Sequence, residues 1–587
     1  MNDINILMVK YMKICKRQKL PRHLKMTNSF LRKHDLVAVP FDKGTGFCLM
    51  KSEQYHEKLS TILALPQFEK LQYTRSNAKD WTLKEEERIN EVLTKLKEAG
   101  KMSEDLLMEL RSCGGQPPRI YGLAKVHKTG TPVRPVLSMP GSPYHKVAKQ
   151  VADWLAVIPE AQIKCSSKLV VDKLKTVQLE EEEVMISFDV SSLYTNVSVK
   201  EAIVQAADRL YAGDLQQPPV DKETFMILAE MSSCSVIMST HDGYYKQVDG
   251  LAMGAPPAPY LANIWLSKFD ATVMDSAKVG ERYMDDILRS IASNQVTSKL
   301  EEINKLHQNL TFTIETEQDG RLPFLDICIL HTGNQLQSTW YTKPTDTGLI
   351  MNYHAIAPRS YKRSVVQGFV HRIYRACSNW KLFDESLERA KITLEQNQYP
   401  REFSDPIIAA TISKIICPEE SPRETDDKAS APAEKCPPLQ MRLQYRGRVT
   451  DNVVRRLRSC QIPIRTIITL RKLKTALPSL KPSVPKPMQS RLIYEITCPG
   501  CNSSYVGQTI RQLKARMAEH GNPTSAVGSH FSLCIGQRPI MDDVKVLATT
   551  SRGHTFQLTL EALYIQERRP NLNLKEEYVS RALTLRI

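Results

Sequence analysis

Between residues 184 and 331, short apolar runs alternate with helical segments. The runs VMISFDV (184–190), YYKQV and FTIETE, together with LPFLDICIL (322–330), have the length and the β-branched or aromatic content of strands. A helical segment begins near residue 199, and residues 250–266 form another largely apolar stretch. This alternation predicts a mixed α+β unit.

The flanking regions carry further elements. LVAVPF and FCLM flank the turn DKGTG (42–46), which predicts two short strands. KEEERINEVLTKLKEAG (84–100) has helical periodicity and a glycine stop. Residues 360–376 and 380–396 have the periodicity of two amphipathic helices.

The composition changes after this helical region. PEESPRETDDKASAPAEKCPP (418–438) is polar and rich in proline, which is typical of a linker. A basic segment follows, and then a second proline-rich spacer, LPSLKPSVPKPMQS (477–490). The last residues, 491–587, have the composition of a compact domain. The simplest interpretation is two folded units joined by a tether.

Length and charge narrow the class of protein. A chain of 587 residues is expected to form about three or four domains. The formal charge of +16 favours a polyanionic partner such as nucleic acid, although such an excess also serves solubility alone. The 13 cysteines are scattered, which fits a reducing compartment. No apolar run approaches a membrane span or a secretory signal, so we expect an intracellular protein.

The segment ERYMDDILRS (281–290) places Asp285 beside Asp286 in an otherwise apolar run. Adjacent carboxylates repel each other, and a divalent cation removes that cost. Asp189 ends the strand-like run VMISFDV about a hundred residues earlier. Each aspartate alone is most simply a turn or cap residue. Together they have the arrangement that a two-metal phosphoryl-transfer site needs, with carboxylates from different strands around Mg²⁺ or Mn²⁺.

These residues resemble reverse transcriptases. YMDD (283–286) is similar to the catalytic hairpin of that family, and FDVSSLY is similar to its first catalytic strand. The resemblance implies that Tyr194 is a steric gate that selects deoxynucleotides. GLAMGAPPAPYLAN (250–263) resembles the segment along the template and the incoming base, where Gly254 lets the backbone approach the nucleotide. Met253 departs from the glutamine found in many relatives.

The same resemblance extends to both sides of the aspartates. RIYGLAKVHKTGTPVRPVLS (119–138) is similar to the fingers segment that holds the triphosphate. Arg134 is the strongest anchor there because a guanidinium binds phosphate in a bidentate manner. Lys125 and Lys128 are further nucleotide-binding candidates, or else surface charges. LPFLDICIL is similar to the primer grip, and the helices up to about residue 396 are similar to a thumb.

The last domain resembles GIY-YIG endonucleases through LIYEITCPGCNSSYVGQTIRQLKARMAEH (492–520) and LTLEALYIQERRPNLN (558–573). This chain reads LIY where that family often reads GIY. The resemblance implies two paired tyrosines, a glycine for close packing, an arginine on the cleaved phosphate, a glutamate on one divalent metal and an asparagine that completes the site: Tyr494, Tyr505, Gly507, Arg516, Glu561 and Asn573. Tyr505 or His520 is the general base that helps to activate water.

CPGC (498–501) lies between the two tyrosine runs. A CxxC knuckle fits a structural, tetrahedral Zn²⁺ that needs two more ligands. His530 and Cys534 are spaced to supply them, and His520 is the alternative. Cysteines that are merely buried or reduced are the other interpretation of Cys498 and Cys501.

A reverse transcriptase followed by a GIY-YIG nuclease, together with DKGTG, YGLAKVHK and WYTKPTDTG (340–348), resembles a Penelope-like retroelement polyprotein. The implied fold is a multidomain α+β right-hand polymerase, then a linker and a small α/β nuclease domain. The predicted domains are an N-terminal region with fingers, a palm, a thumb-like helical region, a linker with a basic connector, and the nuclease: 1–183, 184–335, 336–417, 418–490 and 491–587.

The implied function is target-primed retrotransposition in the nucleus. The nuclease nicks chromosomal DNA, and the freed end primes copying of the element's RNA. The implied partners are an RNA template, a DNA primer or target, and deoxynucleoside triphosphates, with no membrane; the oligomeric state is open. The basic segment 441–475 either holds nucleic acid between the two sites or is a plain connector. Two alternatives stay open: a decayed or domesticated copy that binds nucleic acid without catalysis, and a reverse transcriptase of another lineage.

Overall fold

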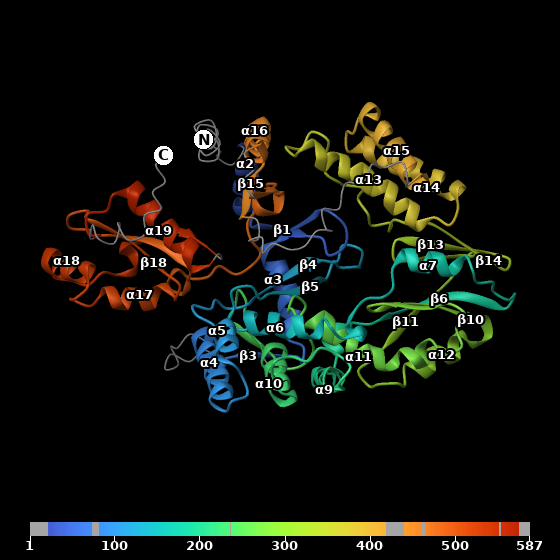
Figure 1. Cartoon of the computed structure of the whole chain (residues 1–587), viewed down its shortest axis with the longest axis horizontal. Helices are drawn as coiled ribbons and strands as arrows, with labels where there is room; N and C mark the ends of the chain where they lie inside the picture. Colours follow the sequence, from blue (N-terminus) through green and yellow to red (C-terminus); the bar gives the residue numbers. More distant parts are fainter. Residues whose placement is uncertain are drawn as a thin grey trace.

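The computed structural model describes residues 22–72, 81–234, 236–417, 439–459, 464–550 and 553–573. Figure 1 shows an elongated molecule with the C-terminal domain at one end and the helices α13 (Arg359–Ala376), α14 (Trp380–Gln396) and α15 (Arg401–Ile416) at the top of the other. The strands and helices of residues 22–340 lie between the C-terminal domain and these helices and also beneath the helices. No helix among the described residues is long and apolar enough to cross a membrane.

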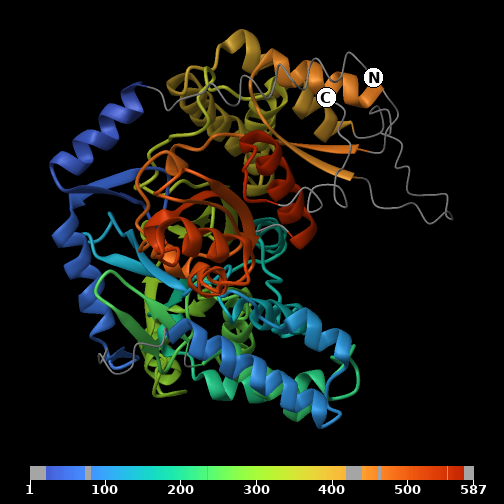
Figure 2. The ribbon, with the colours of Figure 1, turned by 90° about the vertical axis from the view of Figure 1, so that its left-hand side faces the viewer.

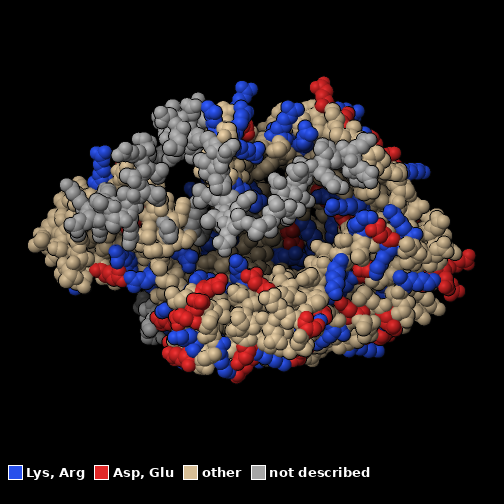
Figure 3. Space-filling view, viewed as in Figure 1, with Lys and Arg blue, Asp and Glu red and all other residues tan. Residues whose placement is uncertain are grey.

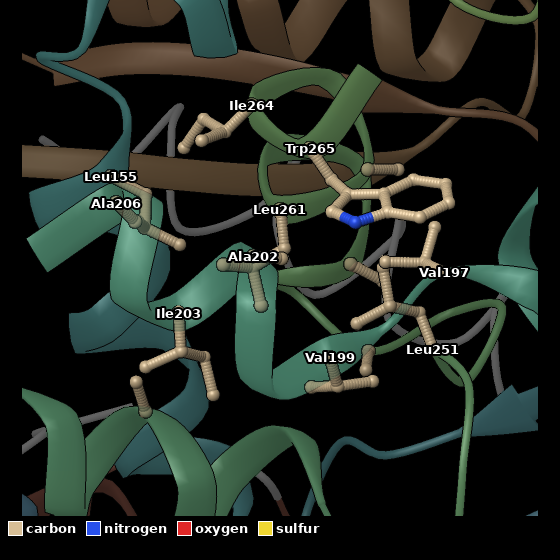
Figure 4. Packing of buried hydrophobic residues seen from close by; sticks show 14 of the residues in the cluster. Leu155, Val197, Val199, Ala202, Ile203, Ala206, Leu251, Leu261, Ile264 and Trp265 are labelled. Carbon is tan, nitrogen blue, oxygen red and sulfur yellow. The ribbon is translucent and has the colours of Figure 1, made fainter. Parts of the chain in front are cut away.

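A four-stranded antiparallel sheet lies at the centre of the predicted palm. Its strand order is β11 (Phe312–Thr316), β6 (Glu183–Val190), β10 (Asp286–Ala292), β9 (Gly280–Tyr283). The neighbouring helices are α8 (Leu193–Asn196), α9 (Val199–Leu210), α10 (Lys222–Ser233), α11 (Ala258–Val273) and α12 (Val296–Ile303). Figure 4 shows Leu261 of α11 beside Ala202 of α9, and Trp265 of α11 on the side of Val197 and Leu251. This buried cluster is the main core of the molecule, because apolar area removed from water stabilises the fold.

Strands from the predicted N-terminal region with fingers, 1–183, form a five-stranded sheet together with two strands from 237–247, a stretch predicted as part of the palm. Its strand order is β3 (Phe68–Leu71), β8 (Tyr244–Gln247), β7 (Ile237–Ser239), β4 (Arg119–Ala124), β5 (Val133–Ser138). The surrounding helices are α2 (Arg22–Lys33), α3 (Ser52–Leu63), α4 (Trp81–Glu98), α5 (Glu104–Leu110) and α6 (His145–Leu155). The expected strands around DKGTG are β1 (Leu36–Pro40) and β2 (Phe47–Lys51), which pair antiparallel. The helix expected at 84–100 is α4, and Gly100 follows it with a positive φ of 72°.

A second core joins a small sheet to the C-terminal helices of the polymerase-like part. The sheet consists of β12 (Arg321–Phe324), β13 (Ile327–Thr332) and β14 (Gln335–Trp340). The helices are α7 (Ser167–Leu174), α13 (Arg359–Ala376), α14 (Trp380–Gln396) and α15 (Arg401–Ile416). The two expected amphipathic helices are confirmed as α13 and α14, and α15 adds a third that contains Pro406.

Part of the predicted connector is folded. Residues 418–438, the first predicted linker, lie outside the described residues. Beyond them, β15 (Leu439–Gln444) and β16 (Ile464–Thr469) pair in parallel, and α16 (Arg448–Ser459) lies between them in the chain. Leu443, Val453 and Leu457 form a small buried core. A βαβ unit therefore forms here, because apolar residues recur at helical spacing between the arginines.

The C-terminal domain has a three-stranded antiparallel sheet in the order β18 (Ser504–Thr509), β17 (Leu492–Thr497), β19 (Val544–Thr549). Its helices are α17 (Leu513–His520), α18 (Ala526–Ile535) and α19 (His554–Arg568). The short 3-10 turns among the described residues are Pro159–Ala161, Ser293–Gln295, Leu473–Thr475, Lys486–Met488 and Met541–Asp543.

This domain is docked on the fingers. Ser490 donates a hydrogen bond of 2.5 Å to the carbonyl oxygen of Gly114, and Gln512 donates one of 3.4 Å to that of Gly115. In the spacer, Lys481 donates a hydrogen bond of 2.8 Å to Ser138 of β5. Figure 2 shows the domain in front of the fingers strands. The predicted tether is thus ordered along 464–490, since the second spacer packs against the sheet.

Candidate active site

Asp189 and Asp286 are direct partners in the central sheet. Asp189 is the penultimate residue of β6, Asp286 is the first residue of β10, and the antiparallel register pairs them. Residues opposite each other in such a pair have Cβ atoms about 4.5–5.5 Å apart. The structure therefore brings together the two strands whose carboxylates the sequence predicted to share a site.

Asp285 lies in the tight turn beside this pair. Tyr283 and Asp286 face each other across the β9–β10 hairpin, so Met284 and Asp285 form a two-residue turn. Met284 has a φ of 56°, an unfavourable conformation for this residue type that is typical of functional turns. The backbone N–H of Val190 donates to the carbonyl oxygen of Asp285 over 3.3 Å, which ties the turn to the end of β6.

Arg282 holds the turn from behind. Its guanidinium makes two hydrogen bonds, of 2.6 and 2.8 Å, to the carboxylate of Asp270 in α11. It also donates to Asn263 over 2.9 Å and to the carbonyl oxygen of Met284 over 3.3 Å. A bidentate ion pair of low exposure fixes both position and orientation, so Arg282 is a positioning residue for the aspartate turn. This role was not predicted from the sequence.

An open cavity of about 500 Å³ lies in front of the carboxylates. Asp189 and Asp286 line it together with Lys43, Lys343 and His127. Lys43 comes from the turn between β1 and β2, and Lys343 comes from the segment after β14. These two segments meet, because the hydroxyl of Thr347 donates a hydrogen bond of 2.9 Å to the carbonyl oxygen of Thr45. Both lysines lie in motifs that marked the family resemblance, DKGTG and WYTKPTDTG, but were assigned no role there.

The carboxyl groups are electrostatically unbalanced. Partial burial, and then Asp285 and Asp189, raise the pKa of Asp286 to about 6, and Lys343 and Lys43 lower it. Partial burial and Asp285 also raise the pKa of Asp189. Both side chains remain open to the cavity. Carboxylate oxygens are the ligands that Mg²⁺ prefers, and a bound divalent cation would relieve this repulsion, so the donor set fits the metal.

The three predicted phosphate-binding residues lie together in the fingers. Arg134 of β5 pairs with Asp42 at 3.0 Å, and Asp42 is almost fully buried. The Arg134 Nε atom is buried without a hydrogen-bond partner among the described residues. Partial burial, and then Arg134 and Lys128, lower the pKa of Lys125. The pKa shift of a cation by neighbouring cations indicates a local positive potential, which attracts polyphosphate.

Tyr194 lies half-buried in α8, directly after the aspartate strand. Burial and Asp285 raise the pKa of its phenol. Its carbonyl oxygen accepts a hydrogen bond of 2.6 Å from the backbone of Leu251, which starts the glycine-rich segment. The phenol is therefore close to the catalytic turn, as a steric gate requires.

Gly254 makes its close approach to the protein's own backbone. It has a φ of +107°, and a Cβ atom there would lie 2.3 Å from the carbonyl oxygen of Leu137. Leu137 in turn donates a backbone hydrogen bond of 2.7 Å to Met253. The glycine is thus required for docking of this segment on β5, a reason that the resemblance did not supply.

The predicted primer grip is the β12–β13 hairpin. Phe324 and Ile327 pair across it, and Leu325 in the turn has a φ of 55°. Pro323, Phe324 and Leu325 line the same cavity as the aspartates. The hairpin therefore faces the aspartate cavity.

In the C-terminal domain, Tyr494 is the centre of a second polar cluster. Its side chain is fully buried, and its hydroxyl contacts His520 Nε2 at 2.7 Å and accepts a hydrogen bond of 3.0 Å from Arg516. Burial raises the pKa of Tyr494, and Glu561 also raises it, which places that carboxylate near the phenol. Burial and Arg516 lower the pKa of His520 to about 4, so this ring is neutral near pH 7.

The second tyrosine packs against the same histidine. The rings of Tyr505 and His520 meet edge to face at 5.1 Å. A Cβ atom on Gly507 would lie 2.7 Å from both Tyr494 Oη and Tyr505 Cε1, so glycine is needed for this packing. The side chain of Asn573 binds the backbone of Val506. Its amide nitrogen donates to the carbonyl oxygen of Val506 over 2.8 Å, and its oxygen accepts from the N–H of Val506 over 2.9 Å. It therefore ties the chain after α19 to β18.

The four predicted zinc ligands converge. The ligand atoms of Cys498, Cys501, His530 and Cys534 all lie within 4.8 Å of one another, a separation compatible with one tetrahedral ion. His520, the alternative ligand, is engaged by Tyr494 instead. Hydrogen bonding between Cys501 and Ser503 is the main cause that lowers the pKa of Cys501 to about 6. The donor set of three thiols and one imidazole suits Zn²⁺.

Two family models match the chain. Residues 126–317 match "Reverse transcriptase (RNA-dependent DNA polymerase)", and residues 349–409 match "Animal helix-turn-helix domain". The second match covers α13, α14 and part of α15, a region predicted only as a thumb. No curated protein matches the chain in sequence.

Solved structures with a similar fold include two telomerases and a viral polymerase. The telomerase of Candida albicans, in complex with a fragment of telomeric RNA, is 11% identical, with 66% of this chain and 65% of that chain covered and a TM-score of 0.41. Apo telomerase from Candida tropicalis is 12% identical, with 66% of this chain and 71% of that chain covered and a TM-score of 0.34. The Sicinivirus 3Dpol RNA-dependent RNA polymerase is 11% identical, with 53% of this chain and 71% of that chain covered and a TM-score of 0.32. At these scores the structural likeness supports no functional argument.

The family match carries the assignment. It includes all three aspartates, Tyr194, Arg134 and Lys128, and it ends after β11, the last strand of the palm sheet. Residues 126–317 of this chain are a reverse transcriptase domain.

Proposed function

We propose that the chain is an RNA-directed DNA polymerase that copies a retroelement RNA at a DNA end made by its own C-terminal nuclease. The observation that carries the proposal is the pairing of Asp189 with Asp286 beside the Asp285 turn, at a cavity that Lys43 and Lys343 also line. Carboxylates from different strands, with cationic side chains nearby, are what nucleotide transfer requires.

Each group of residues around the cavity has its own role in nucleotide transfer. Arg134, Lys125 and Lys128 bind the triphosphate, and the β12–β13 hairpin positions the primer end. Tyr194 restricts the space under the sugar and so favours deoxynucleotides. Asp189, Asp285 and Asp286 hold Mg²⁺ or Mn²⁺, which supplies charge neutralisation and acidifies the primer hydroxyl when it is bound.

Primer extension on an RNA template tests the polymerase. Wild-type protein extends a DNA primer with deoxynucleotides and Mg²⁺, and Asp285→Ala reduces the rate by at least about 10³-fold because a metal ligand is lost. Asp153→Asn, an exposed carboxylate on α6, is the matched control and keeps the wild-type rate. Equal extension by wild type and Asp285→Ala would refute the polymerase.

The nuclease proposal rests on the cluster of Tyr494, His520 and Arg516 with Glu561 nearby. Glu561 binds one divalent metal, Arg516 stabilises the cleaved phosphate, and Tyr505 or His520 helps to activate water. Cys498, Cys501, His530 and Cys534 hold a structural Zn²⁺ that fixes α18 to the β17–β18 turn. The domain would then be a GIY-YIG endonuclease.

Nicking of supercoiled plasmid tests this part. We expect relaxed circles with wild type and none with Glu561→Ala, and wild-type nicking with Glu567→Ala on the same helix. Equal nicking by wild type and Glu561→Ala would indicate a contaminating nuclease.

The coupling of the two reactions has its own test. With plasmid, RNA template and deoxynucleotides together, copied DNA becomes joined covalently to the plasmid at the nick. Glu561→Ala loses this product on intact plasmid and regains it on plasmid that was nicked beforehand, whereas Asp285→Ala makes it on neither. Such a reaction belongs to a Penelope-like element acting in the nucleus. A product that is never joined to the plasmid would refute target priming.

A further inference from the structure

A groove of about 600 Å³ lies between the start of α13 and the βαβ unit. The βαβ unit contributes α16 and β16 to its walls, and α13 contributes its first turn. The hydroxyl of Tyr361 donates a hydrogen bond of 3.1 Å to the carbonyl oxygen of Ile468, which holds the two walls together. The groove is separate from the aspartate cavity, and no lining residue is shared between them.

Three arginines line this groove. Arg455 and Arg458 lie three residues apart on α16, and Arg465 lies on β16. All three are exposed, and within the part of the chain that the structure describes none has an ion-pair partner. The acidic residue in the lining, Asp451, accepts a hydrogen bond of 2.9 Å from Tyr445. The groove is therefore strongly positive.

The position of the groove connects it to the path of a substrate. Figure 1 shows α16 and one end of α13 near each other at the top of the molecule. Figure 3 shows Lys and Arg side chains gathered along that upper edge. After β16 the chain continues to the fingers, where Asn28 of α2 donates a hydrogen bond of 2.9 Å to the carbonyl oxygen of Ala476. The groove thus lies where the connector bridges the thumb-like helices and the fingers.

We propose that this groove binds the sugar–phosphate backbone of a single-stranded nucleic acid. Unpaired arginines bind phosphates in a bidentate manner, and each contact releases condensed counterions. Duplex DNA is read by convex elements that enter its grooves, whereas a concave positive groove suits a single strand. Tyr361 lines the groove and is 37% exposed, so an unstacked base can lie on its ring.

Binding of oligonucleotides to the full chain tests the proposal without nucleotides or divalent metal, so the outcome does not depend on polymerase or nuclease activity. Fluorescence anisotropy is measured for a single-stranded RNA, a DNA of the same sequence and the corresponding duplex over a range of salt concentrations. For single strands, the triple variant Arg455→Gln/Arg458→Gln/Arg465→Gln is expected to flatten the slope of log K against log salt by about 2, from three contacts of about 0.7 each.

Two variants control this measurement. Arg448→Gln removes the same charge from an exposed position of α16 that does not line the groove, and it leaves the slope unchanged. Arg455→Lys/Arg458→Lys/Arg465→Lys keeps the point charges and retains most of the slope. Equal effects on RNA and DNA identify the shared backbone as the ligand, and a larger effect on RNA assigns the groove to the template. An unchanged slope in the triple glutamine variant, or a loss confined to the duplex, would overturn the proposal.

Discussion

Asp189 and Asp286 occupy opposite positions on two hydrogen-bonded antiparallel strands. Asp189 is the penultimate residue of β6 and Asp286 is the first residue of β10, so both lie at the same edge of the sheet, next to Asp285 in the turn. Partial burial, and then the repulsion among these carboxylates, raise the pKa of Asp189 and Asp286. Cation binding would therefore relieve a repulsion that is present before any substrate binds.

This repulsion predicts how stability depends on pH at Asp286. The pKa is raised to about 6 in the folded chain, so the protonated form is favoured, and its contribution is complete below the ordinary pKa and lost as the pH rises through about 6. In EDTA, we expect Asp286→Asn to raise Tm by about 1–2 °C at pH 8 and not at pH 4, because solvent in the cavity screens much of the effect.

Addition of Mg²⁺ should reverse this difference. The ion stabilises wild type by binding its folded state and has less effect on Asp286→Asn. Thermal melts by circular dichroism measure both effects. Equal shifts with Mg²⁺ in the two proteins would show that this carboxylate does not bind the metal.

Arg282→Lys should separate positioning from binding. Lysine cannot reproduce the bidentate contact with Asp270 or reach Asn263 and Met284 at once, so the aspartate turn shifts. We expect kcat for primer extension to fall about 10²-fold while KM for the nucleotide stays the same, since a shift of about 1 Å has that cost. Arg209→Lys, in an exposed ion pair with Asp214, is the control and should keep wild-type kcat. A rise in KM instead would place Arg282 in nucleotide binding.

Lys343 should act on the titration of the site. Its charge lowers the pKa of Asp189 and Asp286 across the shared cavity. In Lys343→Met both pKa values rise, so the acidic limb of the profile of kcat/KM against pH moves to higher pH. Lys381→Met, an exposed lysine on α14, is the matched control and leaves the profile in place. An acidic limb that moves to lower pH would contradict this role.

The cysteine and histidine cluster should bind one zinc ion per chain. Metal content by mass spectrometry, and the visible spectrum after exchange with Co²⁺, report on it directly. Cys534→Ser removes one of four ligands and should lose the metal and lower the stability of the C-terminal domain, since zinc binding contributes folding free energy. Cys417→Ser alters an exposed thiol outside the cluster and should keep the ion. A zinc-free wild-type protein that is equally stable in EDTA would show that the cysteines are simply reduced.

Local patterns were sufficient for many elements. The strands around DKGTG, helix α4, the pair α13 and α14, and the strands that carry Asp189 and Asp286 follow from periodicity and turn residues over short windows. The pattern also predicted the cluster of Cys498, Cys501, His530 and Cys534. The CxxC and HxxxC spacings place their side chains on one face of a turn and of a helix. The βαβ unit was not predicted because the arginines of this segment suggested a charged connector. Leu443, Val453 and Leu457 nevertheless have the spacing of a small core.

The sequence by itself determined the candidate residues: three aspartates, an arginine, two tyrosines and a set of three cysteines and one histidine stand in recognisable local motifs. Only the tertiary structure decided how they combine. It set the register that opposes Asp189 to Asp286, placed Arg282 behind the turn, brought Lys43 and Lys343 to one cavity and engaged His520 with Tyr494. These relationships join residues far apart in the chain. They depend on strand pairing and side-chain packing, which no short stretch of sequence specifies.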